Sequence, residues 1–318
     1  MRLPRRTALL AAGALLAAPA IARAAPPVLR VGNQRGGLRS LLDVSGVAQD
    51  LTYRIEWSEF PAAQPLLEAL NADAVDLGSM GDLNFFSVYA SGAPIKAIAA
   101  QRSDGASQAI VVRGAPGGDG PIRTLADLRG KRVAAARGGW THYSLLAILR
   151  NAGIDPAEVR IAWMLPADAA LAFRAGEVDA WSIWEPYTSL EVLQFGGRVL
   201  ADAHGLTPSA SLIAVNRSAL REKRPLLADF VRRHAAGWAW ARGHLPEYAR
   251  STAQLIRLPV PVLERAYRVN DARAIPLDDA LIREFQTAVD RATEYGVIAR
   301  RINVAEAVDT SFPPGLEG

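Results

Sequence analysis

The chain has 318 residues, of which 50% are hydrophobic and 21% are charged, so its composition is globular rather than disordered or fibrous. It contains no cysteine, which excludes a disulfide framework, thiolate metal sites, a cysteine nucleophile and a lipid-modified N-terminal cysteine. The formal net charge of +4 comes from four arginines within residues 1–24, and the remaining chain is formally neutral, so nothing indicates a nucleic-acid partner.

The N-terminus has the pattern of a cleaved export signal. A basic start is followed by an apolar run over 8–18 that is too short to cross a bilayer, and Ala22-Arg23-Ala24 provides the small residues that signal peptidase requires. We expect residues 1–24 to be removed, by the general secretory or the twin-arginine route, since Arg5-Arg6 fits both. A buried N-terminal helix is the alternative. No later segment reaches 18 apolar residues, so we expect a soluble periplasmic protein.

After this signal, short apolar runs alternate with helical patterns, which indicates βαβ units and parallel sheets. The predicted elements are, in chain order, strand Val28–Gly32, helix Pro65–Asn71, strand Val75–Gly78, helix Leu83–Ser91, strand Ile95–Ala100, strand Lys131–Ala136, helix Thr141–Asn151, strand Arg160–Met164, helix Ala167–Ala175 and strands Val178–Trp184, Arg198–Leu200 and Leu212–Val215. Long helical stretches follow to about Arg301 and are expected to pack back on the first unit.

Shared landmarks indicate that the chain contains two copies of one unit. Arg35-Gly36-Gly37 follows the first strand of one set, and Arg137-Gly138-Gly139 follows the first strand of the other, 102 residues later. Val75-Asp76 and Val178-Asp179 recur at a helix-to-strand junction with an offset of 103 residues. Two matches at nearly the same offset predict two similar lobes.

The predicted fold is therefore a two-lobed α/β protein in which each lobe is a mostly parallel sheet flanked by helices. Lobe I comprises residues 25–109 and 207–318, and lobe II comprises 110–206. The chain is expected to cross between them near Gln108–Arg113 and near Ala203–Ser211, which makes a hinge. Open α/β sheets bind ligands beyond the carboxyl ends of their strands. The expected cleft is lined by Arg35–Gly37, Ser79–Asp82, Gly138–His142 and Trp184–Pro186.

Metal and catalytic motifs are sparse, and we expect neither a metal nor a cofactor. The four histidines are His142, His204, His234 and His244. They form no HxH or HxxxH pair, and the chain has no nucleophile elbow, P-loop or GxGxxG motif. Asp82, Asp168 and Glu185 each open a predicted helix, where capping is the ordinary role of a carboxylate. His142 is either a capping or core residue or a residue of the cleft.

Anion binding accounts for more of the pattern than catalysis does. Glycines between a strand and a helix let backbone N–H groups approach a ligand, and the helix dipole favours negative charge, although tight turns also need glycine for geometry alone. Trp140 and Trp184 add flat apolar walls, so a small anion with an apolar or variable tail fits the cleft. A sulfonate stays ionised and offers three acceptor oxygens. Arg35 would assist with its charge, or lie solvated in its loop.

Several motifs resemble the substrate-binding proteins of aliphatic sulfonate and taurine importers. The motifs are Trp57-Ser58-Glu59-Phe60-Pro61, Leu66-Leu67-Glu68-Ala69-Leu70, Val75-Asp76-Leu77-Gly78-Ser79-Met80-Gly81, Thr141-His142-Tyr143-Ser144-Leu145-Leu146, Pro166-Ala167-Asp168-Ala169 and Gly176–Tyr187. The resemblance covers about 28–215. It implies a periplasmic binding protein of the two-lobed type II class, monomeric and not an enzyme, that hands its ligand to an inner-membrane ABC permease.

The cleft and the resemblance together give the expected ligand-binding residues, which are Gln34, Arg35, Gly36, Gly37, Ser79, Met80, Gly81, Asp82, Gly138, Gly139, Trp140, Thr141, His142, Trp184 and Glu185. The expected ligand is a small alkyl or aryl sulfonate. Taurine, nitrate, a sulfate ester or a thiamin-related pyrimidine on the same fold is the alternative, and Asp82, where we expect Glu or Ser, leaves this choice open. The resembling superfamily also includes a cysteine-rich pyrimidine synthase, against which the absence of cysteine argues directly.

Overall fold

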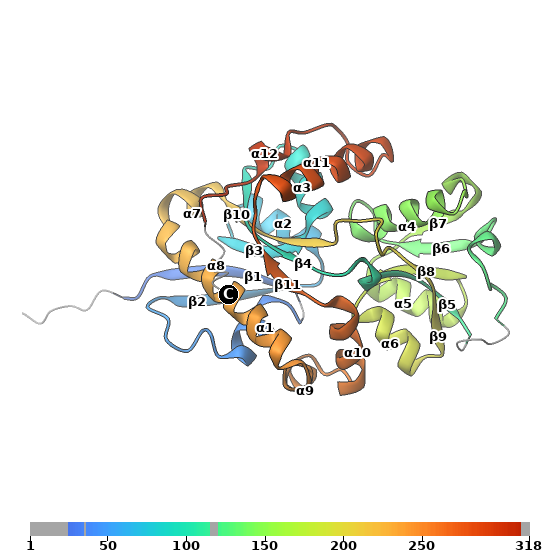
Figure 1. Cartoon of the computed structure of the whole chain (residues 1–318), viewed down its shortest axis with the longest axis horizontal. Helices are drawn as coiled ribbons and strands as arrows, with labels where there is room; N and C mark the ends of the chain where they lie inside the picture. Colours follow the sequence, from blue (N-terminus) through green and yellow to red (C-terminus); the bar gives the residue numbers. More distant parts are fainter. Residues whose placement is uncertain (1–24, 35, 115–119, 313–318) are drawn as a thin grey trace, which may run out of the picture.

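The computed structural model describes residues 25–34, 36–114 and 120–312, which form two α/β lobes side by side, each built on one sheet (Figure 1). The expected export signal, residues 1–24, lies outside the described residues. Within the described ranges, no helix has the length and apolar character needed to cross a membrane. We call the lobe of the first sheet lobe I and that of the second sheet lobe II.

Lobe I contains a six-stranded sheet in the order β11-β4-β10-β3-β1-β2. Its strands are β1 (Val28–Gln34), β2 (Arg54–Phe60), β3 (Leu77–Gly81), β4 (Ile95–Arg102), β10 (Ala210–Asn216) and β11 (Arg273–Ile275). One face is covered by α2 (Ala63–Asn71), α3 (Asp82–Ala90), α11 (Asp279–Glu294) and α12 (Val304–Ala307), and the other by α1 (Leu38–Ser45) and α8 (Arg224–Gly243), preceded by α7 (Arg217–Glu222). Each face buries its own apolar cluster, so the sheet separates two cores.

Lobe II contains a five-stranded sheet in the order β7-β6-β8-β5-β9. Its strands are β5 (Gln108–Arg113), β6 (Arg132–Ala135), β7 (Arg160–Trp163), β8 (Ala180–Trp184) and β9 (Gly197–Asp202). Helix α4 (Trp140–Asn151) covers one face, and α5 (Pro166–Ala175) and α6 (Tyr187–Gln194) cover the other. Three short 3-10 helices, η1 (Gly105–Ser107), η2 (Leu125–Leu128) and η3 (Pro156–Glu158), lie in the connections.

The two-lobed fold is as predicted, but both sheets are mixed rather than mostly parallel. β1 pairs in parallel with β2 and β3, and β6 with β7 and β8, whereas β10 and β5 are antiparallel to both of their neighbours. The reason is the path of the chain between the lobes. A strand that arrives from the other lobe enters at the edge where its neighbours end, so it runs in the opposite direction.

The two connections between the sheets run over 103–107 and 203–209. The second coincides with the predicted crossing at Ala203–Ser211. The first differs from the prediction, because Gln108–Arg113 is strand β5, whose residues Ala109–Val112 are buried in the second sheet. The division into lobe I (25–109 and 207–318) and lobe II (110–206) remains our proposal for the domain limits.

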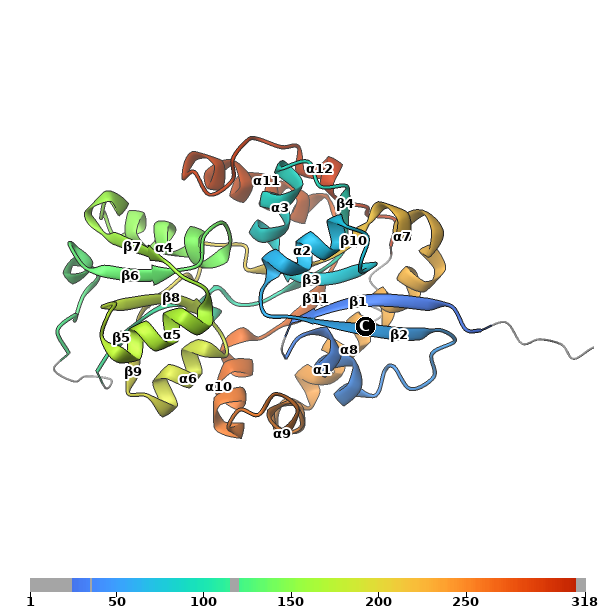
Figure 2. The ribbon, with the colours of Figure 1, turned by 180° about the vertical axis from the view of Figure 1, so that it is seen from behind.

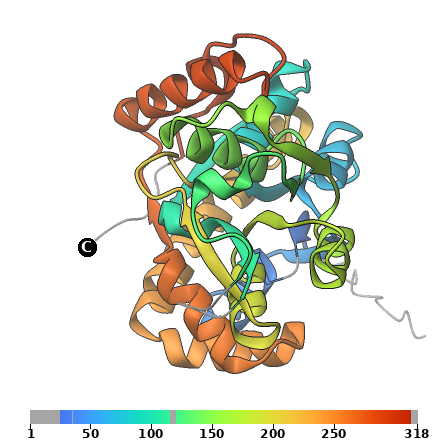
Figure 3. The same ribbon diagram turned by 90° about the vertical axis from the view of Figure 1, so that its right-hand side faces the viewer.

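The C-terminal helices contact both lobes. Besides α8 and α11 on lobe I, α9 (Leu245–Ile256) leads into α10 (Val260–Asn270), which lies beside α6 of lobe II (Figure 2). Viewed from the side of lobe II, α11 and the α9–α10 pair lie at opposite ends of the molecule (Figure 3). The tail therefore flanks the crossings instead of packing on lobe I alone.

The internal repeat has a structural counterpart. The Asp76 carboxylate accepts a hydrogen bond from the backbone N–H of Arg30 (2.7 Å), and the Asp179 carboxylate accepts one from the backbone N–H of Arg132 (2.8 Å). In both lobes this bond ties the first strand of the unit to the segment that leads into its third strand. The glycines of the two turns also match, since Gly36 has φ 75° and Gly138 has φ 78°.

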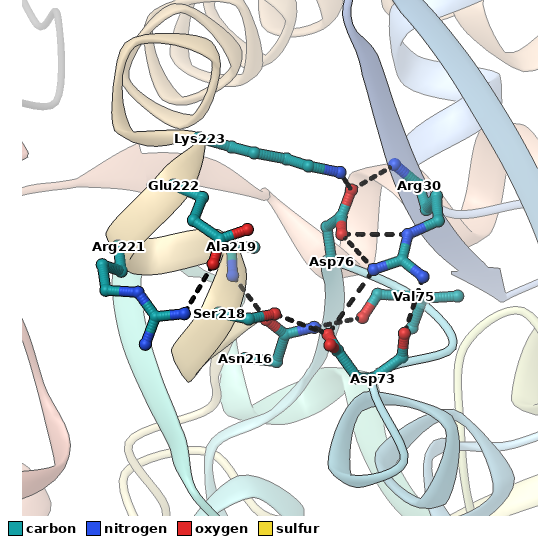
Figure 4. Close-up of polar contacts among 10 residues, drawn as sticks. All are labelled: Arg30, Asp73, Val75, Asp76, Asn216, Ser218, Ala219, Arg221, Glu222 and Lys223. Atoms are coloured by element: carbon teal, nitrogen blue, oxygen red, sulfur yellow. Dashed lines mark hydrogen bonds and ion pairs between the residues drawn. The ribbon is translucent and has the colours of Figure 1, made fainter.

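Asp76 also anchors a polar network at the amino ends of these strands (Figure 4). Its carboxylate is fully buried and accepts hydrogen bonds from the Arg30 guanidinium and from Nζ of Lys223, both at 2.6 Å. Burial raises the pKa of Asp76, but the bonds from Arg30 and Lys223 outweigh it and leave that pKa below its ordinary value. Two cations thus compensate one buried carboxylate, at the edge of the sheet far from the cleft.

Candidate ligand-binding site

A cavity of about 690 Å³ lies between the carboxyl edges of the two sheets. Its lining residues in lobe I are Gly32, Gln34, Gly37, Leu38, Ala62, Ala63, Gln64, Ser79, Met80, Gly81, Asn84, Ser87, Gln101 and Ser211. Those in lobe II are Ala136, Arg137, Gly138, Gly139, Trp140, Thr141, Trp163, Met164, Leu165, Pro166 and Trp184. The volume suits a small organic molecule, and both lobes would hold it.

Most of the predicted site residues line this cavity. They are Gln34, Gly37, Ser79, Met80, Gly81, Gly138, Gly139, Trp140, Thr141 and Trp184. Arg35 lies outside the described residues. Gly36, Asp82, His142 and Glu185 do not line the cavity, and the last three have other partners. We therefore take the ten lining residues as the proposed contact set.

Asp82 connects the lobes instead of facing the cavity. It is 1% exposed, and its Oδ1 accepts a hydrogen bond from Nε1 of Trp140 at 2.6 Å, while its Oδ2 accepts one from the backbone N–H of Ala210 at 3.2 Å. Burial raises the pKa of Asp82 to about 6, against the lowering effect of these bonds. It is the first residue of α3 and not its N-cap, which is Gly81. Its role in this structure is to hold the Trp140 ring at the cavity wall.

His142 supports the glycine turn of lobe II from behind. Its Nδ1 accepts a hydrogen bond from the backbone N–H of Gly138 at 3.3 Å, and its ring meets the ring of Trp163 edge to face at 4.5 Å. Burial, followed by the positive charge of Arg137, lowers the pKa of His142 to about 4. The ring is therefore neutral near pH 7 and keeps the lone pair that this bond needs.

Glu185 joins α6 to α10. Its Oε2 accepts a hydrogen bond from the backbone N–H of Ser189 at 3.0 Å, and its Oε1 pairs with the Arg265 guanidinium at 3.1 Å. Burial raises the pKa of Glu185, with the bonds from Ser189 and Arg265 acting in the opposite direction. The carboxylate thus stabilises the start of α6, as a capping role predicts, and ties it to the C-terminal helices.

The charge of the cavity comes from Arg137, which is not among the predicted site residues. Arg137 is the only charged residue among the described lining residues, and none of them is acidic. Its guanidinium carbon lies 4.3 Å from the centroid of the Trp163 ring, a cation–π contact that fixes the side chain against a wall of the cavity. The internal repeat could have identified Arg137 as a site residue, because Arg137 occupies the position in lobe II that Arg35 occupies in lobe I.

At two lining positions only glycine fits, because a side chain there would collide with a residue of the opposite lobe. A Cβ at Gly139 would lie 2.2 Å from Nδ2 of Asn84, and a Cβ at Gly81 would lie 2.9 Å from the indole of Trp140. Tyr143, Leu146 and Ala147 of α4 also pack into the apolar cluster of lobe I. The lobes are therefore closed on one another around the cavity.

The described residues contain no group of three or more His, Asp or Glu side chains that is arranged to hold a metal ion. The cavity instead is lined by the glycine turn at the start of α4, by the serines Ser79, Ser87 and Ser211, by one guanidinium and by several apolar residues. This combination fits a small anion with an apolar or weakly polar tail.

Comparison with known proteins supports the same conclusion. The family described as NMT1/THI5 like matches residues 59–249. A protein of Escherichia coli (strain K12) that is named as an aliphatic sulfonates-binding protein is 30% identical over 301 residues, which are 93% of this chain and 92% of that protein.

Solved structures agree. The alkanesulfonate-binding protein SsuA from Xanthomonas axonopodis pv. citri, bound to MOPS, has a TM-score of 0.82 and 30% identity over 90% of this chain and 99% of that chain. The periplasmic aliphatic sulphonate binding protein SsuA from Escherichia coli has a TM-score of 0.78 and 29% identity over 91% of this chain and 99% of that chain. The resemblance seen in the motifs is thereby confirmed, and the chain belongs to the NMT1/THI5-like family, among the relatives of the aliphatic sulfonate-binding proteins.

Proposed function

We propose that the protein is a periplasmic solute-binding protein that delivers a small organosulfonate anion to an inner-membrane ABC importer. One observation carries this proposal: the cavity is lined by a single charged side chain, Arg137, and by no acidic residue among those described. An anion meets no repelling carboxylate there. The names of the aliphatic sulfonate-binding relatives support the same ligand class.

The parts of the cavity suggest how the ligand lies. The sulfonate head would meet Arg137 and the backbone N–H group of Gly139, where α4 begins and its dipole favours negative charge. The tail would lie along the apolar wall formed by Met164, Leu165 and Trp184. Because the apolar wall makes no directional contact with the tail, sulfonates with tails of different length would fit.

The proposal also covers the location of the protein, its oligomeric state and its lack of enzyme activity. Residues 1–24 would be removed after secretion, and the monomeric mature protein would bind its ligand in the periplasm and dock on the permease. The protein would not be an enzyme: the chain has no cysteine nucleophile, and no histidine or carboxylate is among the described residues that line the cavity.

Titration calorimetry tests the proposal with ethanesulfonate, longer alkanesulfonates, taurine, sulfate and nitrate. We expect sulfonates to bind with a dissociation constant of about 1 μM, or about −8 kcal/mol. Binding of nitrate or taurine without simple sulfonates would instead favour the alternative ligands. Chemical conversion of any of these ligands would show that the protein is an enzyme.

A further inference from the structure

A buried histidine lies behind the cavity, between a glutamine that lines it and a tryptophan that does not. Gln101 is on β4 and is one of the residues that line the cavity. His234 on α8 is 1% exposed, and its Nε2 lies 3.1 Å from the Oε1 position of Gln101. The indole Nε1 of Trp238, one turn further along α8, donates a hydrogen bond to the same Nε2 at 3.0 Å.

The tryptophan determines where the proton of this histidine lies. An indole N–H only donates, so Nε2 of His234 carries a lone pair and the ring proton is on Nδ1. Burial lowers the pKa of His234 to about 4, so the ring stays neutral near pH 7. One ring nitrogen therefore faces both Trp238 and Gln101 as an acceptor.

This acceptor decides which way the Gln101 amide turns. A carbonyl oxygen that faced the Nε2 lone pair would be repelled, whereas an amide NH₂ donates to it. The two ends of an amide have nearly the same shape, so an exchange of its O and N removes the repulsion without moving a heavy atom. The single lone pair of Nε2 is then shared by the indole N–H and the amide NH₂. No other hydrogen bond joins the Gln101 amide to a described residue. Its carbonyl oxygen then faces the cavity.

We propose that His234, held by Trp238, is a positioning residue that turns the carbonyl oxygen of Gln101 toward the ligand, so that the cavity selects organosulfonates whose tail carries a hydroxyl or amine donor. This inference rests on the proposed function and adds the chemistry of the second end of the ligand. An acceptor at Gln101 repels the sulfonate head, which is thereby confined to Arg137 of the other lobe. The head and the tail donor would each have a partner on a different lobe.

The test compares two ligands that differ only in the tail donor, ethanesulfonate and 2-hydroxyethanesulfonate, by titration calorimetry. We expect the hydroxylated ligand to bind about tenfold more tightly to the wild type, the value of one well-formed hydrogen bond. Taurine serves as a third probe with an ammonium donor. Gln101→Leu removes the acceptor, so the ratio of its affinities for the two ligands should fall to about one, whatever its affinity for ethanesulfonate.

Trp238→Phe tests the positioning role, because the variant removes the indole N–H and leaves Gln101 in place. The proton of His234 can then move to Nε2 and donate to Oε1 of Gln101, which turns the NH₂ group to the cavity. We expect the preference for the hydroxyl to disappear. Trp240→Phe is the matched control on the same helix, since the Trp240 ring stacks on His244, and it should keep the preference.

Nitrogen NMR of the ring separates positioning from a general loss of structure. We expect His234 to carry its proton on Nδ1 in the wild type and on Nε2 in Trp238→Phe. Equal affinity of the wild type for the two sulfonates, or an unchanged preference in Trp238→Phe, overturns the inference. A wild type that binds neither sulfonate but binds nitrate overturns the proposed function instead, and a ring proton found on Nε2 of the wild type overturns the inference alone.

Discussion

At the scale of single residues, the charge of Arg137 is the first contribution to test. Arg137→Gln removes the guanidinium that faces the cavity, so we expect the affinity for every sulfonate to fall by about 10- to 100-fold, in the range of charge-assisted hydrogen bonds. Arg160→Gln, an exposed arginine of β7 that does not line the cavity, is the control and should bind normally. Calorimetry with ethanesulfonate measures both. Equal affinities would place the anion elsewhere.

The variant Gly139→Ala tests whether the lack of a side chain at this position is needed for the two lobes to close on the ligand. A methyl group at this position collides with the side chain of Asn84 across the cleft, so Gly139→Ala should weaken binding by about 1–3 kcal/mol. Its backbone φ of −155° is extended and permits any residue, so the cost comes from space alone. The double variant Gly139→Ala with Asn84→Ala should recover part of the affinity. Full additivity of the two changes, measured by calorimetry, would contradict a direct contact.

His142 gives a pH dependence with a definite sign. Its pKa is about 4 in the folded protein and about 6.5 when unfolded, so the unfolded chain takes up a proton first as the pH falls. The free energy of unfolding should therefore decrease between about pH 6.5 and pH 4. Asp82, with a folded pKa of about 6 against 3.8, contributes the opposite slope over nearly the same window. His142→Asn removes only the first effect.

Urea denaturation at several pH values measures the slope. We expect the loss of stability between pH 7 and pH 4.5 to be smaller in His142→Asn than in the wild type. His204→Asn is the control, because His204 is exposed and its pKa is raised by Asp104. Its removal should not reduce the acid-induced loss of stability. Identical profiles for His142→Asn and the wild type would show that the ring is charged or free in the folded state.

At the scale of elements, the bond between Asp82 of α3 and Trp140 of α4 joins the lobes at the cavity wall. Trp140→Phe leaves the buried Asp82 without this donor when the lobes close, so we expect ligand affinity to fall by about 1–3 kcal/mol. Asp82→Asn keeps an acceptor oxygen for Trp140, so it should bind ligand more tightly than Trp140→Phe, but its NH₂ group replaces the acceptor of the Ala210 N–H and should lower the melting temperature. Calorimetry and thermal unfolding measure the two effects.

The elements also show what the sequence could and could not predict. Strands such as β4 and β6 are apolar runs bounded by turn residues, and helices α2 and α4 have clear apolar spacing, so these were found. Helix α1 and strand β11 are not predicted, because both are too short to give a periodic pattern. Helix α1 has eight residues and follows directly on a glycine turn, and β11 has three residues. The sequence predicts a crossing at β5 instead of a strand, because the burial of β5 depends on β8 and β9, which come later in the chain.

The site residues also divide into those that local sequence predicts and those that only strand pairing brings together. The glycine turns before α1 and α4 were predicted because a left-handed glycine at a strand end has a local sequence signal. Gln101 and Ser211 were missed, since they meet only through the antiparallel register of β4 and β10, across more than a hundred residues of chain. Arg137 was visible as the repeat of Arg35 but was not assigned a role. Local chemistry is readable from sequence, whereas partners set by strand pairing are not.

At the scale of the whole molecule, the position of the cavity predicts a hinge motion. Both lobes contribute to its lining, and the chain passes between the sheets only at 103–107 and 203–209 within the described residues. The contacts of Trp140 with Asp82 and of Gly139 with Asn84 place the structure in a closed arrangement. A ligand that touches both lobes binds this arrangement better than an open one, so it shifts the population toward closure.

Small-angle scattering measures this shift directly. We expect the radius of gyration of the wild type to decrease when ethanesulfonate is added to saturation, and Arg137→Gln to show no decrease at the same concentration. Trp140→Phe should contract less at equal occupancy, because it lacks the bond that joins the closed lobes. An unchanged radius at saturation, with binding verified by calorimetry, would show that the lobes are closed before the ligand arrives.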